Sequence, residues 1–296
     1  MKIGLALART RPELFAEATV AAEAAGFESV WLSDHLVFPT NMAGGPQHFR
    51  GSSDGQGSEV IPGPPPTTPI YEVGAMLSFL AAKTQTIRLG TFVYLLGIRH
   101  PFVAARAVST VDILSGGRLE LGVGSGWLRS EWEAAGLEPK SRGARLEESI
   151  ALCRRLWTED AVEHDGRFWQ FEEVAFEPKP VQQAVPILIG GESDVALDRA
   201  ARIGDGWIGM NHSPATAASA IDRLRSAEAR VGRGSTPCTV SIGGSITSAE
   251  EFREYEQAGV DRVILAPWNR VRDTLSAIEQ FGEDFLRCIP GAARRA

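Results

Sequence analysis

The sequence is poor in the residues that build disulfide frameworks and metal sites. Among its 296 residues are three cysteines, Cys153, Cys238 and Cys288, which lie far apart without CxxC spacing. This pattern excludes a disulfide scaffold and a zinc ribbon, and it indicates free or buried thiols in a reducing compartment. The chain has five histidines. Because a metal site in a barrel needs several histidines at strand ends, we expect no catalytic metal.

Long apolar runs and an excess of positive charge are also missing. No stretch approaches the roughly 18 apolar residues that span a bilayer. The first residues enter a strand-like run without the basic and apolar regions of a secretory leader. The net charge of −7 argues against a polyanion-binding surface. We therefore expect a cytoplasmic protein that binds neither membranes nor nucleic acids.

The chain does contain a regular alternation of strand-like and helix-like segments. Apolar residues make up 44% of it and charged residues 23%, which is enough for a full core. The candidate strands are residues 2–8, 29–33, 87–93, 118–124, 185–190, 206–210, 238–243 and 261–266. Helical periodicity fills most of the intervals, for instance at 13–25, 71–83, 145–157, 195–203 and 217–231. No domain boundary is visible, so we expect residues 1–296 to form a single domain.

This alternation predicts an α/β fold with a parallel sheet. Eight βα units close into a TIM (β/α)8 barrel, and an open doubly wound sheet is the alternative. Ala25-Gly26, Ile203-Gly204 and Ala258-Gly259 each end a helix with glycine shortly before a buried strand. We interpret them as three copies of one helix-to-strand joint, in which glycine adopts the left-handed conformation that closes the helix.

Two segments interrupt the alternation. Residues 39–69 are rich in Gly, Pro, Ser and Thr and too long for a plain connection. We expect them to form an inserted loop after strand 2, on the carboxyl face of the barrel, which is either a mobile lid or a passive loop. Residues 159–176 alternate aromatic and polar residues around Asp165-Gly166. This pattern predicts a hairpin insertion after the fourth unit.

The segment from Gly116 to Trp127 ends an alternating apolar run in glycines, just where a helix should begin. Gly124 and Gly126 remove side chains that would keep a ligand off the backbone, and the amides of the next turn face that space. The turn suits an anionic or planar cofactor. On its own, however, the G-x-G-x-G pattern also fits glycines that merely turn the chain.

Other strand ends carry candidate groups on the same face. Ser33-Asp34-His35 ends the second strand, where a histidine beside an aspartate suits a proton relay, a metal ligand or a hydrogen bond to a ligand. The alternative is a helix cap by Asp34 with His35 packed nearby. Residues 89–94, which end the third strand, are either part of an ordinary core strand or a bulge that backs a planar ring. Gly190-Gly191 ends the fifth strand as a second anion nest, with Ser193 or Asp194 available as a helix cap.

Taken together, these motifs resemble the bacterial luciferase-like family, and most closely its branch that uses the deazaflavin coenzyme F420. The residues that carry the resemblance are 22–26 with Ser33-Asp34-His35, then 88–91, 114–118 with 124–127, the helix 145–157, and Gly190-Gly191 followed by 204–207. The resemblance covers nearly the whole chain. It implies a TIM barrel with an inserted segment, a flavin or deazaflavin at the carboxyl face, and a homodimer.

The resemblance also implies roles for individual residues. Asp34 and His35 contact the deazaflavin ring, and a non-proline cis peptide at Phe92-Val93 supports the ring from behind. The turns hold the side chain and phosphate. The expected cofactor-binding set is Ser33, Asp34, His35, Phe92, Val93, Gly124, Ser125, Gly126, Trp127, Gly190 and Gly191. His35 and Asp34 are the expected catalytic residues, with His35 as proton donor or acceptor and Asp34 orienting the ring edge.

The sequence departs from one sugar-phosphate dehydrogenase branch of the family. That branch carries a Trp shortly after the Asp-His pair and a Glu directly after the glycine turn, where this chain has Phe38-Pro39 and Trp127. Sugar-phosphate oxidation is therefore not supported. We expect an F420-dependent oxidoreductase that moves a hydride between the deazaflavin and a small organic substrate. The alternatives are an FMN-dependent monooxygenase and a non-catalytic flavin-binding barrel.

Overall fold

The computed structural model describes residues 1–40 and 64–287 as a closed barrel of parallel strands. Around the barrel the strand order is β1-β10-β9-β8-β7-β4-β3-β2. The barrel strands are β1 (Lys2–Ala6), β2 (Ser29–Leu32), β3 (Arg88–Thr91), β4 (Leu119–Val123), β7 (Ile187–Gly190), β8 (Gly206–Gly209), β9 (Thr239–Gly243) and β10 (Arg262–Leu265). Each coincides with a predicted strand. The closed barrel is confirmed, and the open sheet is wrong.

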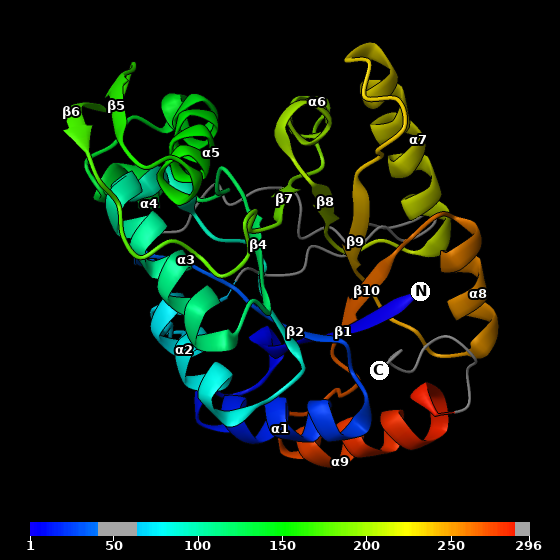
Figure 1. Cartoon of the computed structure of the whole chain (residues 1–296). Coiled ribbons are helices and arrows are strands. Elements are labelled where there is room, and N and C mark those ends of the chain that lie inside the picture. Colours follow the sequence, from blue (N-terminus) through cyan, green and yellow to red (C-terminus); the bar gives the residue numbers. More distant parts are fainter. Residues whose placement is uncertain (41–63, 288–296) are drawn as a thin grey trace.

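The helices surround the strands and cover their outer faces (Figure 1). They are α1 (Phe15–Ala25), α2 (Val73–Lys83), α3 (Pro101–Ser115), α4 (Arg129–Ala134), α5 (Arg142–Thr158), α6 (Asp194–Ile203), α7 (Pro214–Arg230), α8 (Ala249–Gln257) and α9 (Thr274–Phe281). The first and last helices, α1 and α9, pack side by side. Because β1 also pairs with β10, the two ends of the described chain close the barrel together.

Two of the three predicted helix-to-strand joints have the expected geometry. Gly26 after α1 has φ 99° and Gly259 after α8 has φ 88°, both in the left-handed region. Gly204 after α6 is different, because its φ of −88° is open to any residue. A Cβ atom there would lie 2.8 Å from Ile189 Cγ1 and 2.9 Å from the Gly206 carbonyl oxygen. Close packing, and not backbone conformation, therefore requires this third glycine.

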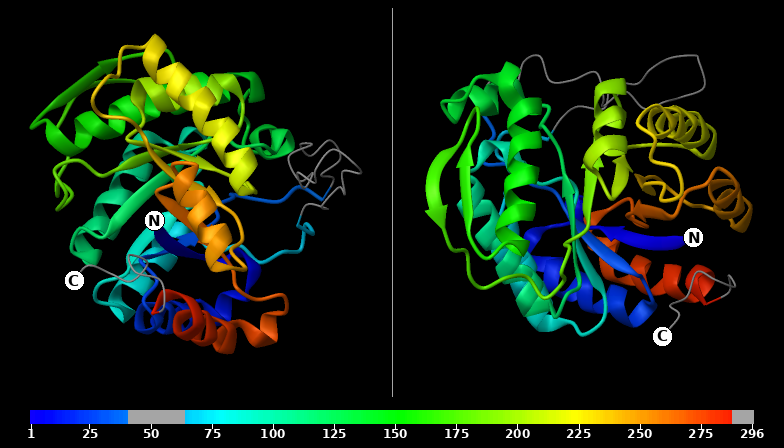
Figure 2. Two further views of the ribbon diagram at one scale, coloured as in Figure 1. Left: turned by 90° about the vertical axis from the view of Figure 1, so that its right-hand side faces the viewer. Right: turned by 45° about the horizontal axis from the view of Figure 1, so that its top comes forward.

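The predicted hairpin is present as β5 (Val162–Asp165) paired antiparallel with β6 (Gln170–Val174). It lies outside α5 (Figure 2), and Glu148 of α5 accepts hydrogen bonds from the amides of Phe168 and Trp169. Most of the predicted loop insertion, residues 41–63, lies outside the described residues. The lid interpretation therefore stays a prediction.

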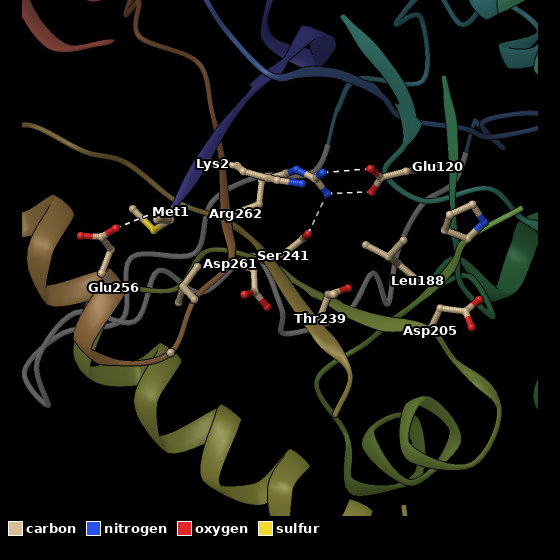
Figure 3. A pocket seen from close by; sticks show the side chains of 13 residues that line it. Met1, Lys2, Glu120, Leu188, Asp205, Thr239, Ser241, Glu256, Asp261 and Arg262 are labelled. Atoms are coloured by element: carbon tan, nitrogen blue, oxygen red, sulfur yellow. Dashed lines mark hydrogen bonds and ion pairs between the residues drawn. The ribbon is translucent and has the colours of Figure 1, made fainter. Parts of the chain in front are cut away.

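The amino-terminal end of the barrel is closed by charge pairs. The buried Arg262 guanidinium donates to both Glu28 and Glu120 at 2.8–2.9 Å. Burial opposes its charge, but the two carboxylates outweigh burial and raise the pKa of Arg262. A cavity of about 670 Å³ opens here, lined by Lys2, Asp205 and Arg262 among others (Figure 3). It lies at the strands' amino ends, opposite the predicted cofactor site.

Candidate functional site

The predicted site residues follow the carboxyl ends of β2, β3, β4 and β7, and the barrel brings these four strand ends to one rim. A Cβ atom at Gly124 would lie 2.5 Å from Val93 Cγ2, and one at Gly190 would lie 2.9 Å from Val93 Cγ1. The ring of His35 meets the edge of the Trp127 ring at 5.6 Å. The structure thus assembles the predicted set in one place. Ser33 lies exposed beside it.

Phe92 and Val93 form a floor across the mouth of the barrel. The peptide bond between them is cis, at the position that the resemblance implied. Below the floor, Trp31, Leu188, Ile208 and Ile264 fill the barrel. Phe92 and Val93 pack on this cluster but remain half-buried. They therefore present an apolar surface to the mouth.

The glycines at the rim make room for this floor. The Val93 side chain occupies the space that side chains at Gly124 and Gly190 would need, and a Cβ atom at Gly243 would lie 3.1 Å from the Phe92 ring. The reason given for Gly124 from the sequence, close approach of a ligand to the backbone, is therefore incomplete. Its immediate neighbour is Val93, and the flat floor depends on small residues beneath its two side chains.

Asp34 does not face the mouth of the barrel. Its side chain is 1% exposed, and its carboxylate accepts hydrogen bonds from both terminal nitrogens of the Arg99 guanidinium, at 2.7 and 2.8 Å. It also accepts the Leu95 amide at 2.9 Å. Burial opposes the charge of Arg99, but Asp34 outweighs it and raises the pKa of Arg99. Asp34 thus joins the end of β2 to the segment after β3 and caps no helix there. Sequence reasoning missed Arg99.

His35 has a different acidic partner. Its Nδ1 lies 2.8 Å from Oε2 of Glu131, on α4. The Glu131 side chain is fully buried, and the His35 side chain is 12% exposed. Phe38 and Trp127 flank the imidazole with ring centroids at 4.6 and 5.6 Å. Sequence reasoning missed Glu131 because it looked for an acid directly after the glycine turn, and the acid lies one helical turn further on.

The first glycine turn is shaped by its own neighbours. Gly126 has φ 73°, and a Cβ atom there would lie 3.0 Å from Trp132 Nε1 and 3.1 Å from Leu95 Cδ2. Both the backbone conformation and the packing therefore require glycine at this position. Ser125 and Trp127, on either side of Gly126, are half-buried. The turn thus places the Trp127 ring against His35.

The second glycine turn is held from β8. Gly191 has φ 126°, its carbonyl accepts the Trp207 indole N–H at 2.9 Å, and Ser193 caps α6 as predicted. The next residue, Glu192, accepts the Met210 amide at 2.7 Å and lies 2.9 Å from His212 Nε2. Sequence reasoning missed this second Glu–His couple. It stabilises the turn rather than facing the floor.

Among residues 1–40 and 64–287, no group of three or more His, Cys, Asp or Glu side chains is placed to hold a metal ion. In the same part of the chain, no helix has the length and apolarity to cross a membrane. Cys153 and Cys238 are buried and free. Burial raises the pKa of each thiol to about 12, so neither is a nucleophile near neutral pH. Cys288 lies beyond the described residues.

Comparison with known proteins places this chain in a family. Residues 4–280 match the model of the luciferase-like monooxygenases. An uncharacterised protein of Mycobacterium tuberculosis is 29% identical over 97% of this chain and 99% of its own. The F420-dependent glucose-6-phosphate dehydrogenase of Amycolatopsis mediterranei is 34% identical over 67% of this chain and 53% of its own. The solved structure of an F420-dependent secondary alcohol dehydrogenase in complex with an F420–acetone adduct shares the fold, with a TM-score of 0.74. It is 17% identical to this chain, and the match covers 95% of this chain and 97% of that one.

Proposed function

The chain belongs to the luciferase-like monooxygenase family, and within it we propose that the protein is an F420-dependent oxidoreductase. The proposed reaction moves a hydride between the deazaflavin and a small organic substrate. The 34% identity to an F420-dependent dehydrogenase supports the choice of cofactor. The observation that carries the proposal is His35, a proton-exchanging side chain that contacts Trp127 of the first glycine turn, at the rim where Val93 lies against Gly124 and Gly190.

The residues present fit a planar ring with an anionic tail. Phe92 and Val93 offer a half-buried apolar surface to one face of a ring. The turns at 124–127 and 190–191 present backbone at either side of that floor, which suits a phosphate and its side chain. When bound, F420 carries or accepts the hydride at C5 of its deazaflavin.

The protein's own residues position the reactants and handle the proton. Reduction of a carbonyl needs a hydride on carbon and a proton on oxygen, and oxidation of an alcohol needs the reverse. His35 is proposed to hold or take that proton at Nε2, because Nδ1 faces Glu131. Asp34 is proposed to act through position, since both of its oxygens bind Arg99. This replaces the direct contact with the ring that the sequence suggested.

Replacement of His35 tests the role of the proton carrier. General acid or base assistance contributes about 10² to 10⁴-fold to a rate. His35→Ala should therefore lower kcat by about that factor, with reduced F420 and an accepted substrate. The Kd for F420 should change much less, because the glycine turns hold the tail. A kcat within a few-fold of wild type together with a large loss of F420 affinity would make His35 a binding residue.

The FMN-dependent monooxygenase is the second candidate, because the family model takes its name from that activity. Oxygen uptake separates the two functions, since carbon at position 5 of a deazaflavin suppresses reaction with dioxygen. Substrate-dependent change of F420 absorbance without oxygen uptake supports the proposal. Substrate-dependent formation of an oxygenated product with reduced FMN and dioxygen, absent without the protein, supports the monooxygenase. Binding without any substrate-dependent change of absorbance would identify a non-catalytic flavin-binding barrel.

We also propose a homodimer through the neighbouring helices α2 and α3. Phe79 on α2 is 49% exposed, and Val103 and Leu114 on α3 are 62% and 57% exposed. Exposed large apolar side chains on neighbouring helices are a feature of protein interfaces. Sedimentation of the purified protein should give twice the chain mass, and a monomer at micromolar concentration would contradict this proposal.

A further inference from the structure

Glu131 is a buried carboxylate that forms no ion pair with a Lys or Arg side chain in the described part of the chain. Its partners are hydrogen-bond donors from the segment that leaves β2. Oε1 accepts the Leu36 amide at 2.6 Å, with the Val37 amide further away at 3.4 Å. Oε2 faces His35 Nδ1 at 2.8 Å. A buried carboxylate needs such donors, because an unpaired charge in the interior is costly.

These contacts determine which nitrogen of His35 carries the proton. The Leu36 N–H is an obligatory donor, so Oε1 accepts from it. An ionised carboxylate can only accept, so with Glu131 ionised the 2.8 Å contact at Oε2 is a hydrogen bond donated by His35 Nδ1. Nε2 is then the ring atom that remains for exchange with a bound molecule.

The position of α4 fixes this arrangement. Trp132, the residue after Glu131, is fully buried and packs with Leu95 and Ile98. Asp34 cannot take over the task of Glu131, because its oxygens bind Arg99 and the Leu95 amide. Glu131 is thus the acid that orients His35, although Asp34 is its neighbour in the sequence.

We propose that Glu131 is a positioning residue that locks His35 as the Nδ1–H tautomer and directs Nε2 to the mouth of the barrel. The inference rests on the proposed function only for the use made of Nε2. The tautomer itself is a property of the protein without cofactor. It is therefore testable apart from any activity.

The first test is nuclear magnetic resonance of the apoprotein labelled with ¹⁵N-histidine. His35→Gln identifies the His35 signals among those of the five histidines. The wild-type ring should show Nδ1 protonated and Nε2 unprotonated in its neutral form. In Glu131→Gln the Leu36 N–H still needs an oxygen, so the new amide NH₂ turns toward Nδ1, which must then accept. The tautomer should invert to Nε2–H.

The matched control is Glu133→Gln on the same helix, whose carboxylate is exposed and pairs with Arg129 at the surface. It should leave the His35 signals unchanged. Glu131→Asp keeps a carboxylate and should retain the Nδ1–H tautomer. An Nε2–H tautomer in the wild type, or an unchanged tautomer in Glu131→Gln, would overturn the proposal. The wild-type spectrum, assigned with His35→Gln, decides the tautomer, so a Glu131 variant that fails to fold does not remove the test.

The second test is kinetic. With the tautomer inverted, Nε2 can no longer accept a proton in its neutral form, and kcat should fall by about 10²-fold or more in the direction that needs a base. KM and the Kd for F420 should stay within about threefold, as expected when ground-state binding is kept. A Glu131→Gln enzyme with inverted tautomer and wild-type kcat overturns the positioning role. A wild type that binds no F420 instead overturns the proposed function and leaves the tautomer result standing.

Discussion

Asp34 and His35 are adjacent in the sequence, yet the fold gives their side chains different partners. Asp34 binds Arg99, 65 residues away, and His35 binds Glu131, 96 residues away. Both partners come from segments that meet only when the barrel closes. The sequence could therefore predict that a His and an Asp stand at the rim. It could not predict that a second acid, Glu131, binds the histidine and that Arg99 pairs with the aspartate.

Glu23 provides a second prediction at the residue scale, on how the stability of the protein depends on pH. Its carboxylate, on α1, accepts the amides of Thr86 at 2.6 Å and Ile87 at 2.8 Å. Burial raises its pKa, but these backbone donors outweigh burial and lower the pKa of Glu23 to about 2. A depressed folded-state pKa means that the contribution to stability is present above the unfolded value near 4.5 and is lost as the pH falls toward 2.

Glu23→Gln should therefore lower the free energy of unfolding at pH 7 by about 1.5 kcal/mol, the lower end for hydrogen bonds to a charged group because the side chain is partly exposed to solvent. The difference from wild type should shrink as the pH falls from about 4.5 to 2. Urea unfolding across this range measures it. Glu17→Gln on the same helix serves as control. A difference that is independent of pH would contradict the assigned cause.

At the scale of elements, packing between the ends of β3, β4 and β7 forms the floor made by Phe92 and Val93. Val93 after β3 fills the space left by Gly124 after β4 and Gly190 at the end of β7. Glycine-rich strand ends could be recognised in the sequence, and so could the hairpin at 159–176. The sequence does not reveal that these glycines leave room for the Val93 side chain, because the contact joins three separate strand ends.

A double-mutant cycle tests the contact between Val93 and Gly124. Gly124→Ala places a methyl group 2.5 Å from Val93 Cγ2, and such overpacking should cost about 1–3 kcal/mol. Val93→Ala removes the methyl groups that clash. The double variant should therefore be more stable than the sum of the two single changes predicts. Urea unfolding gives the four free energies, and simple additivity would show that Val93 is not what requires Gly124.

At the scale of the whole molecule, a buried ion-pair network and the proposed functional site lie at opposite ends of the barrel. The amino-terminal end holds the Arg262 network with Glu28 and Glu120, and the carboxyl end holds the floor and His35. The alternation of segments was enough to predict the closed barrel, because eight βα units leave few other topologies. The amino-terminal network was not predicted, since its members come from β10, β4 and the residue before β2.

Arg262→Met should lower the stability of the protein without changing its affinity for F420. It leaves the carboxylates of Glu28 and Glu120 without their buried partner, and removing one member of a buried ion pair costs about 3–5 kcal/mol. The Kd for F420 of the folded variant should stay close to wild type. Arg129→Met, which removes a surface pair with Glu133, should change stability by less than about 1 kcal/mol. Chemical unfolding and ligand titration on the same samples check both expectations. A large loss of F420 affinity in folded Arg262→Met would contradict the claim that the amino-terminal ion pairs act on stability alone.

The most direct measurement is a parallel titration of the purified apoprotein with F420 and with FMN, followed by tryptophan fluorescence, since Trp127 lies in the first glycine turn at the mouth of the barrel. We expect F420 to saturate the protein with one molecule per chain and to quench this fluorescence. We expect FMN to bind at least about tenfold more weakly, a difference of about 1.4 kcal/mol. Tighter binding of FMN, or no binding of F420, would contradict the assignment of this barrel to deazaflavin chemistry.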